Sequence, residues 1–184
     1  MTRPRVIRIV ALLVILVCSA GCDQATKHLA RRGLSQTGSI TLPGSFIQFT
    51  LAENPGAFLS LGASLPPVAR RALAVGLGVS LAFLLVYLVR MHRLRWLCFL
   101  GLALVWAGGV SNLADRVFRH GLVTDFIVFR VGPLHTGIFN VADFAVVGGT
   151  FLLVASLRTG PHQDEVRGRS NAATVRDSRT RTRW

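Results

Sequence analysis

The sequence predicts an all-α membrane protein, a bundle of four transmembrane helices with a small extracytoplasmic β-sheet inserted between the first and second helix. Of its 184 residues, 51% are hydrophobic, and the mean hydropathy is +0.51. The hydrophobic residues gather in four runs, each long enough to cross about 30 Å of hydrocarbon. Such a length allows a single bundle, which we expect to occupy residues 1–158.

The four runs differ in the signals that bound them. The first follows Arg3, Arg5 and Arg8 and continues as a helix to Lys27 or His28. The second follows two prolines, which favour the first turn of a helix. We expect the spans to cover residues 6–28, 68–89, 94–113 and 138–157.

The connections between the runs have different characters. Residues 39–61 carry apolar side chains around the turns Pro43-Gly44 and Asn54-Pro55-Gly56, a pattern typical of short strands. Residues 121–137 are partly apolar and are expected to form an outer loop at the membrane surface. Residues 159–184 are polar and Arg-rich, and we expect a disordered cytoplasmic tail.

The net charge of +13 comes almost wholly from arginine. These arginines lie in membrane-flanking loops and the tail, so we expect contact with anionic membrane lipids and not with nucleic acid. An even number of spans places both termini on one side. The short Arg90–Arg95 loop and the tail favour the cytoplasm for that side.

Four carboxylates lie at the edges of the apolar runs, where a charged group is costly unless it has a function. In this topology Asp23, Asp115 and Asp143 lie at the outer ends of the first, third and fourth spans, and Asp125 lies in the last outer loop. The sequence therefore predicts a polar site near the outer leaflet.

The neighbours of these carboxylates allow two interpretations. Asn112 and Asp115 are three residues apart, as are Asn140 and Asp143, so each pair shares a helix face. Asp23 has Lys27 four residues on, the spacing of a helical ion pair. Such groups can preorganise a site, but Asn and Asp near helix ends are also common caps. Four clusters on one side favour function.

Asp125 and Asp143 are the candidates for chemistry. Two carboxyls held close together in a low-dielectric site share a proton, so one can act as a base on water while the other acts as an acid. No Ser/His/Asp set is evident in the sequence. A metal site that uses His120 and His135 is disfavoured because the spacing of ligands does not support it.

Five motifs in register resemble the lipoprotein signal peptidase family (signal peptidase II). They are Asp23-Gln24-Ala25-Thr26-Lys27, Asn54-Pro55-Gly56-Ala57, residues 108–116 (GGVSNLADR), residues 123–127 (VTDFI) and Phe139-Asn140-Val141-Ala142-Asp143. The resemblance implies an intramembrane aspartic endopeptidase of the bacterial cytoplasmic (inner) membrane. It would cut diacylglyceryl-modified prolipoproteins on the amino side of the modified cysteine, as a monomer without metal or cofactor.

The same resemblance assigns roles by position. Asp125 and Asp143 match the catalytic pair. The positions that match the lining or bracing of the pocket are Asp23, Lys27, Asn54, Gly56, Asn112, Asp115, Arg116 and Asn140. The sequence departs from the family pattern at four places. Ala57-Phe58-Leu59 stands where the family more often has two small residues and then an aromatic. Ser111 replaces a frequent Gly, Thr124 a frequent Val, and Phe144 a frequent small hydroxyl residue. Phe144 and Phe58 leave the substrate range open.

Two alternatives remain open at this point. The first is a non-enzymatic polytopic membrane protein, such as a small carrier or assembly factor, whose intramembrane carboxylates bind protons or cations. The second is a lipoprotein signal peptide cleaved before Cys22, since Ser19-Ala20-Gly21-Cys22 follows a basic start and an apolar run. Against the second, three further spans follow. A nucleic-acid-binding anchor is the weakest interpretation, because it rests only on the tail arginines.

Overall fold

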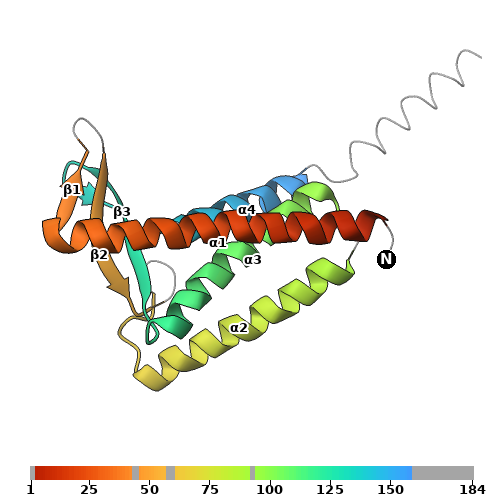
Figure 1. Cartoon of the computed structure of the whole chain (residues 1–184), viewed down its shortest axis with the longest axis horizontal. Coiled ribbons are helices and arrows are strands. Elements are labelled where there is room, and N and C mark those ends of the chain that lie inside the picture. Colours follow the sequence, from red (N-terminus) through yellow and green to blue (C-terminus); the bar gives the residue numbers. More distant parts are fainter. Residues whose placement is uncertain (1–2, 43–45, 57–60, 92–93, 159–184) are drawn as a thin grey trace, which may run out of the picture.

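A computed structural model describes residues 3–42, 46–56, 61–91 and 94–158 of the chain (Figure 1). It contains four helices that are long and apolar enough to cross a membrane. They are α1 (Arg3–Thr37), α2 (Pro67–Arg90), α3 (Trp96–Phe118) and α4 (Val141–Arg158). The prediction of four membrane-spanning helices is confirmed. The predicted disordered tail and Phe58 lie outside the described residues.

Helix α1 is longer than the sequence predicts. It has 35 residues, so it is about 52 Å long and extends past the membrane. The additional turns are amphipathic, and Ala30 and Leu34 pack against Phe126 in a small second core. The helix ends where Gly38 takes a φ of +74° and donates its N–H to the carbonyl of Leu34 at 2.9 Å.

The N-terminal half of α1 is integrated into the bundle. Arg8 is buried and donates hydrogen bonds to the carbonyls of Met91, at 3.0 Å, and of Leu94. Its guanidinium lies 5.2 Å from the ring centroids of both Trp96 and Phe99. The segment before Cys22 therefore clamps the α2–α3 connection, which disfavours its interpretation as a removable signal peptide.

The sheet is assembled from two connections, and the predicted insertion between the first two helices supplies only half of it. Strands β1 (Ser39–Thr41) and β2 (Ile47–Asn54) come from that insertion. Strands β3 (Val123–Val131) and β4 (Leu134–His135) come from the predicted outer loop. All pairs are antiparallel in the order β1-β2-β3-β4. Strand β3 is not evident in the sequence, because the first half of the strand is buried on both faces and its apolar and polar residues do not alternate.

Helix α3 is the centre of the bundle and packs against α1, α2 and α4. Its contact with α4 depends on glycines. A Cβ atom on Gly149 would lie 2.5 Å from the carbonyl oxygen of Gly101, and one on Gly108 would lie 2.5 Å from that of Ala142. Small residues thus let the two backbones approach closely, as is common between transmembrane helices.

We predict opposite effects for alanine at two adjacent glycines of α4. Gly149→Ala should lower the thermal stability of the detergent-solubilised protein, by about 1–3 kcal/mol, because the new Cβ meets backbone atoms of α3. Gly148→Ala is the matched control, since nothing lies within 4 Å of its added Cβ. It should be neutral or stabilising by up to about 1 kcal/mol. Equal melting temperatures for the two variants would contradict the close helix contact.

Candidate active site

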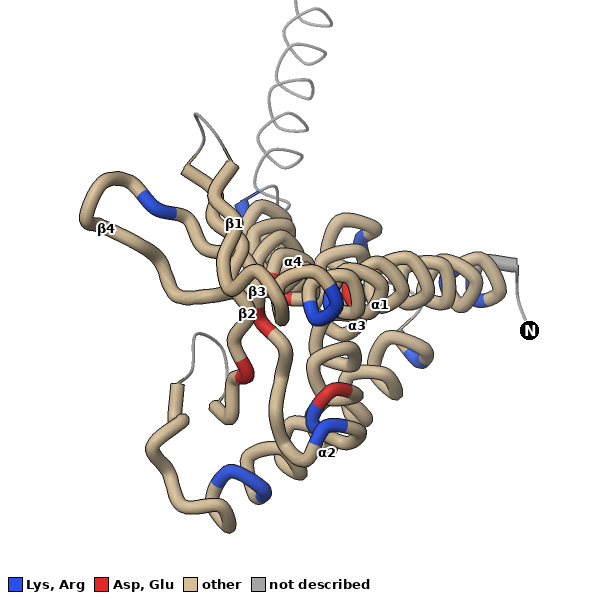
Figure 2. The backbone as a smooth tube through the Cα atoms, turned by 60° about the vertical axis from the view of Figure 1, so that its left-hand side comes forward, with Lys and Arg blue, Asp and Glu red and all other residues tan. Residues whose placement is uncertain are grey.

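The polar clusters converge where the sheet meets the helices. Figure 2 shows the acidic positions of the described backbone near this junction, with α1, α3 and α4 on one side and β2 and β3 on the other. Asp23, Asp115, Asp125 and Asp143 are all buried there, with at most 8% of each residue exposed. Glu53 differs, because it forms a partly exposed ion pair with Arg119.

Lys27 occupies the centre of the supporting network and is fully buried. Its Nζ lies 2.7 Å from Oδ2 of Asp23 and 2.9 Å from Oδ2 of Asp115. It also donates to Oδ1 of Asn112 at 2.9 Å. One ammonium group thus joins α1 to α3 and offsets the charge of two carboxylates that would otherwise be buried without a cation.

These two carboxylates also accept hydrogen bonds from other parts of the chain, and Oδ2 of each is shared between Lys27 and a second donor. Asp23 accepts hydrogen bonds from the hydroxyl of Ser111, at 2.7 Å, and from the backbone N–H of Ala142, at 2.8 Å. Asp115 accepts from the side chain of Gln24 at 3.0 Å and from the backbone N–H of Thr124 at 3.2 Å. Asp23 therefore holds the start of α4, and Asp115 holds the start of β3.

Asn140 and Asp143 form a capping box at the start of α4. The N–H of Asn140 donates to Oδ2 of Asp143 at 3.1 Å, and the N–H of Asp143 donates to Oδ1 of Asn140 at 3.0 Å. The interpretation of this pair as a helix cap is thus correct, and it does not exclude a catalytic role. The side-chain amide of Asn140 also donates to Oδ1 of Asp125 at 2.6 Å, so the cap fixes both carboxyls.

Amide groups surround Asp125 and Asp143 and donate hydrogen bonds to both carboxyls. Oδ2 of Asp125 accepts from the side chain of Asn54 at 2.9 Å. Oδ1 of Asp143 accepts from the side chain of Asn112 at 3.0 Å. With the bonds from Asn140, each of the four carboxyl oxygens has an amide donor. The two groups are therefore oriented by strand β2, helix α3 and the α4 cap together.

Burial raises the pKa of Asp125 to about 6. The hydrogen bond from Asn54 opposes this shift, and the charge of nearby Asp143 adds to it. A carboxyl that holds its proton this far above the ordinary range, beside a second carboxyl, can serve as the protonated member of an acid–base pair.

Gly56 and Arg116 tie the turn after β2 to α3. The N–H of Gly56 donates to Oδ1 of Asn54 at 2.8 Å, which leaves the amide of that asparagine directed at Asp125. Arg116 donates to the carbonyl of Gly56 at 2.6 Å and to that of Asn112 at 3.0 Å. All ten residues singled out in the sequence thus belong to one connected region.

Four further residues support the site although the sequence assigned them no role in it: Gln24, Arg31, Ser111 and Thr124. Gln24 contacts Ser111 as well as Asp115, and Arg31 donates to the hydroxyl of Thr124 at 2.9 Å. Gln24, Lys27 and Arg31 follow one another at intervals of three and four residues. A longer first helix would have shown them on one face. Thr124 is fully buried, and its partner Arg31 lies in the turns of α1 that the sequence did not predict.

No group of three or more His, Cys, Asp or Glu side chains is placed to hold a metal ion within the described part of the chain. The absence of a metal or cofactor requirement stays a prediction.

Comparison with known proteins identifies relatives over nearly the whole bundle. The family model described as signal peptidase (SPase) II matches residues 12–158. A lipoprotein signal peptidase of Leifsonia xyli subsp. xyli is 35% identical over 187 residues, which cover 96% of this chain and 82% of that protein. One of Coxiella burnetii is 38% identical over 153 residues, 82% of this chain and 88% of that protein. The resemblance inferred from the motifs is confirmed.

Two solved structures described as bacterial membrane enzymes share the fold. The first has a TM-score of 0.67 at 24% identity, and the aligned part covers 84% of this chain and 92% of the solved one. The second has a TM-score of 0.65 at 22% identity and covers 82% and 94%. At these identities the likeness speaks for the fold alone.

We predict that Lys27→Met destabilises the protein far more than the loss of another α1 cation. Removing the ammonium leaves the carboxylates of Asp23 and Asp115 buried without a cation, which lowers the free energy of unfolding by about 3–5 kcal/mol. Arg32→Met, on the exposed face of the same helix, should change the free energy of unfolding little. The measurement is thermal unfolding of both purified proteins. Similar stability would show that Lys27 is not the centre of the network.

Proposed function

The chain belongs to the signal peptidase II family, and from that premise we propose how this peptidase works. It removes signal peptides from prolipoproteins by cutting on the amino side of the diacylglyceryl-modified cysteine. Asp125 and Asp143 are its catalytic pair. The observation that carries this assignment is the shared hydrogen-bond frame, in which Asn140 donates to both buried carboxyls.

The chemistry follows from one proton held between two carboxyls. The ionised member takes a proton from water, and the resulting oxygen attacks the peptide carbonyl carbon. The protonated member donates to the carbonyl oxygen, which gives a neutral tetrahedral intermediate. Its collapse breaks the C–N bond, and a proton passes to the departing amine of the modified cysteine. The pair then returns to its starting state with one proton, so no metal is needed.

The remaining eight residues position this pair. Lys27, Asp23 and Asp115 join α1 to α3 and hold the starts of α4 and β3, which carry the pair. Asn54, Asn112 and Asn140 orient its oxygens. Arg116 and Gly56 hold the turn that presents Asn54. Fixed amide donors around carboxyls that change charge during the reaction need little reorganisation, which favours catalysis.

The proposal includes an orientation in the bacterial inner membrane. The sheet lies at one end of the bundle, and the N-terminal end of α1 lies at the other (Figure 1). Asp125 lies in strand β3, and Asn140 of the α4 cap donates to it, so the carboxyl pair belongs to the end that carries the sheet. Both termini in the cytoplasm would therefore put the pair near the outer leaflet, where prolipoproteins present their modified cysteine. We further propose that the enzyme acts as a monomer, since the residues of the pair and its frame all come from one chain.

Membership in a peptidase family overturns the alternative of a non-enzymatic carrier or assembly factor. The arrangement of the acids agrees with that, because ion paths in transporters usually place them near the bilayer midplane. Here all four buried carboxylates gather at one end of the helices, beside the sheet.

Asp125→Asn and Asp143→Asn should each leave insertion and folding intact and lower cleavage by at least about 10²–10⁴-fold. The assay expresses each variant in bacterial cells that lack their own lipoprotein signal peptidase and follows prolipoprotein processing by gel mobility. Glu53→Gln is the control, since it removes a nearby carboxylate that is partly exposed and paired with Arg119. Near-normal processing by either aspartate variant would remove that residue from the mechanism.

Asn54→Ala should move the limb of the pH–rate profile that belongs to Asp125 to higher pH. Asn54 donates to the Asp125 carboxylate and thereby lowers its pKa, so its loss should raise that pKa above about 6. The direction is the same whether Asp125 acts as acid or as base. The measurement is kcat/KM of purified enzyme against pH, with Thr50→Ala on the same strand as control. An unmoved profile in Asn54→Ala would contradict the assignment.

A further inference from the structure

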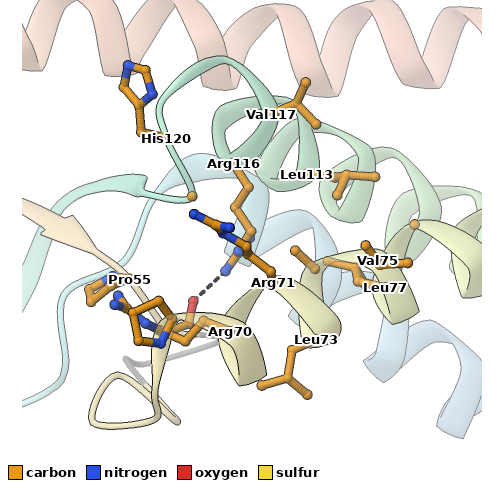
Figure 3. Close-up of a pocket in the computed structure, with 15 residues that line it drawn as sticks. Pro55, Arg70, Arg71, Leu73, Val75, Leu77, Leu113, Arg116, Val117 and His120 are labelled. Carbon is orange, nitrogen blue, oxygen red and sulfur yellow. Dashed lines mark hydrogen bonds between the residues drawn. The ribbon is translucent and has the colours of Figure 1, made fainter.

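A large groove lies between α2 and α3 (Figure 3). Its lining contains neither Asp125 nor Asp143, but it shares Gly56 and Arg116 with the supports of that pair. Its volume is about 800 Å³. Three arginines line one end of it, and aliphatic side chains from both helices line the rest. The lining residues used below are Arg70, Arg71, Leu73, Leu77, Gly78, Leu113 and Arg116. We refer to this cavity as the α2–α3 groove.

The three arginines differ in the partners that they have among the described residues. Arg116 is bound to the carbonyls of Gly56 and Asn112. The described lining of the groove contains no acidic side chain that could pair with Arg70 or Arg71. The Nε of Arg70 is buried and has no hydrogen-bond partner among the described residues. A buried N–H donor without an acceptor is costly, so an anion at this place would stabilise the structure.

The position of Arg70 and Arg71 on α2 adds to this cost. The helix starts at Pro67, and its N-cap, Pro66, supplies no side-chain hydrogen bond. Both arginines therefore lie near the positive end of the helix dipole, where cations are unfavourable and anions are favourable. In the proposed orientation they also lie on the outer side, against the usual bias of positive charge toward the cytoplasm. A bound anion would offset both effects.

The other part of the groove is suited to a hydrocarbon chain. Leu73 and Leu77 follow the arginines by one and two turns along α2, and Leu113 faces them from α3. Arg70 and Leu77 are separated by about 10 Å along the helix axis. A ligand that fills the groove therefore needs an anionic group at one end and an apolar chain at the other.

We propose that the α2–α3 groove is a binding site for an anionic glycerophospholipid, with its phosphate at Arg70 and Arg71 and an acyl chain along Leu73, Leu77 and Leu113. The diacylglyceryl group of the proposed substrate carries no charge and would not use the two guanidinium groups. An acidic segment of a peptide would use the charges but not the apolar half. The inference does not depend on the assignment of the catalytic pair.

The charged half is tested with the full-length protein in neutral detergent. Retention of phosphatidylglycerol and of phosphatidylcholine is compared by native mass spectrometry. Wild type should retain the anionic lipid preferentially. Arg70→Gln/Arg71→Gln should lose about tenfold or more of that retention, given the contribution of a basic side chain near an anionic headgroup. Arg32→Gln/Arg130→Gln, which removes two exposed arginines outside the groove, should keep it.

The apolar half has its own matched pair on α2. Gly78 lines the groove, and a Cβ added there would make only ordinary contact, 3.5 Å from a methyl group of Leu113. Gly78→Leu should therefore fold and fill the chain-binding part, which lowers phosphatidylglycerol retention with both arginines in place. Gly76→Leu is the control, because nothing lies within 4 Å of its added Cβ and the residue does not line the groove.

Three results would overturn the proposal. Equal retention of the two lipids by wild type would show that the groove does not recognise an anionic headgroup. Equal losses in the groove variant and in Arg32→Gln/Arg130→Gln would reduce the effect to general surface charge. Displacement of the lipid by an acidic peptide without acyl chains, at concentrations that saturate wild type but not Arg70→Gln/Arg71→Gln, would assign the arginines to a peptide ligand.

Discussion

The ion triad of Lys27, Asp23 and Asp115 is the interaction on which the rest of the structure depends. A buried carboxylate close to hydrocarbon is strongly unfavourable by itself, and the fold needs two of them to hold the starts of α4 and β3. One ammonium group makes both possible. The capping box and strand β3 then place Asp143 and Asp125. The two carboxyls that we propose as catalytic are thus held in place by two other carboxylates.

The polar supports also explain a division of labour within each motif. In the α1 motif, Asp23 contacts both α3 and α4, while Lys27 and Gln24 contact α3. In the α4 motif, Asn140 caps its own helix with one side-chain atom and orients Asp125 with another. Such a residue can therefore be a helix cap and a site residue at once. Here the cap is what holds the residues of the candidate site in place.

The sequence was sufficient for the four spans and for the convergence of the polar residues, since both follow from hydropathy and from which end of a span each carboxylate occupies. It was insufficient where pairing is long-range. The burial of β3 on both faces removes the alternation that identifies a strand, so residues 121–137 resembled a loop. The last turns of α1 were missed because their stability comes from packing against Phe126, which is distant in sequence. Arg31 was missed with them, and so was its hydrogen bond to Thr124.

The origin of the sheet in two separate connections has a consequence for the time at which the enzyme becomes active. Asn54 and Asp125 meet across 71 residues, and Asp23 reaches the backbone of Ala142 across 119. Until synthesis has passed α3 and delivered β3 and the start of α4 to the same side as β2, neither carboxyl has its frame. With Asp125 and Asp143 as the proposed pair, a nascent chain therefore has no partial peptidase activity, and cleavage begins only when the last helix is inserted.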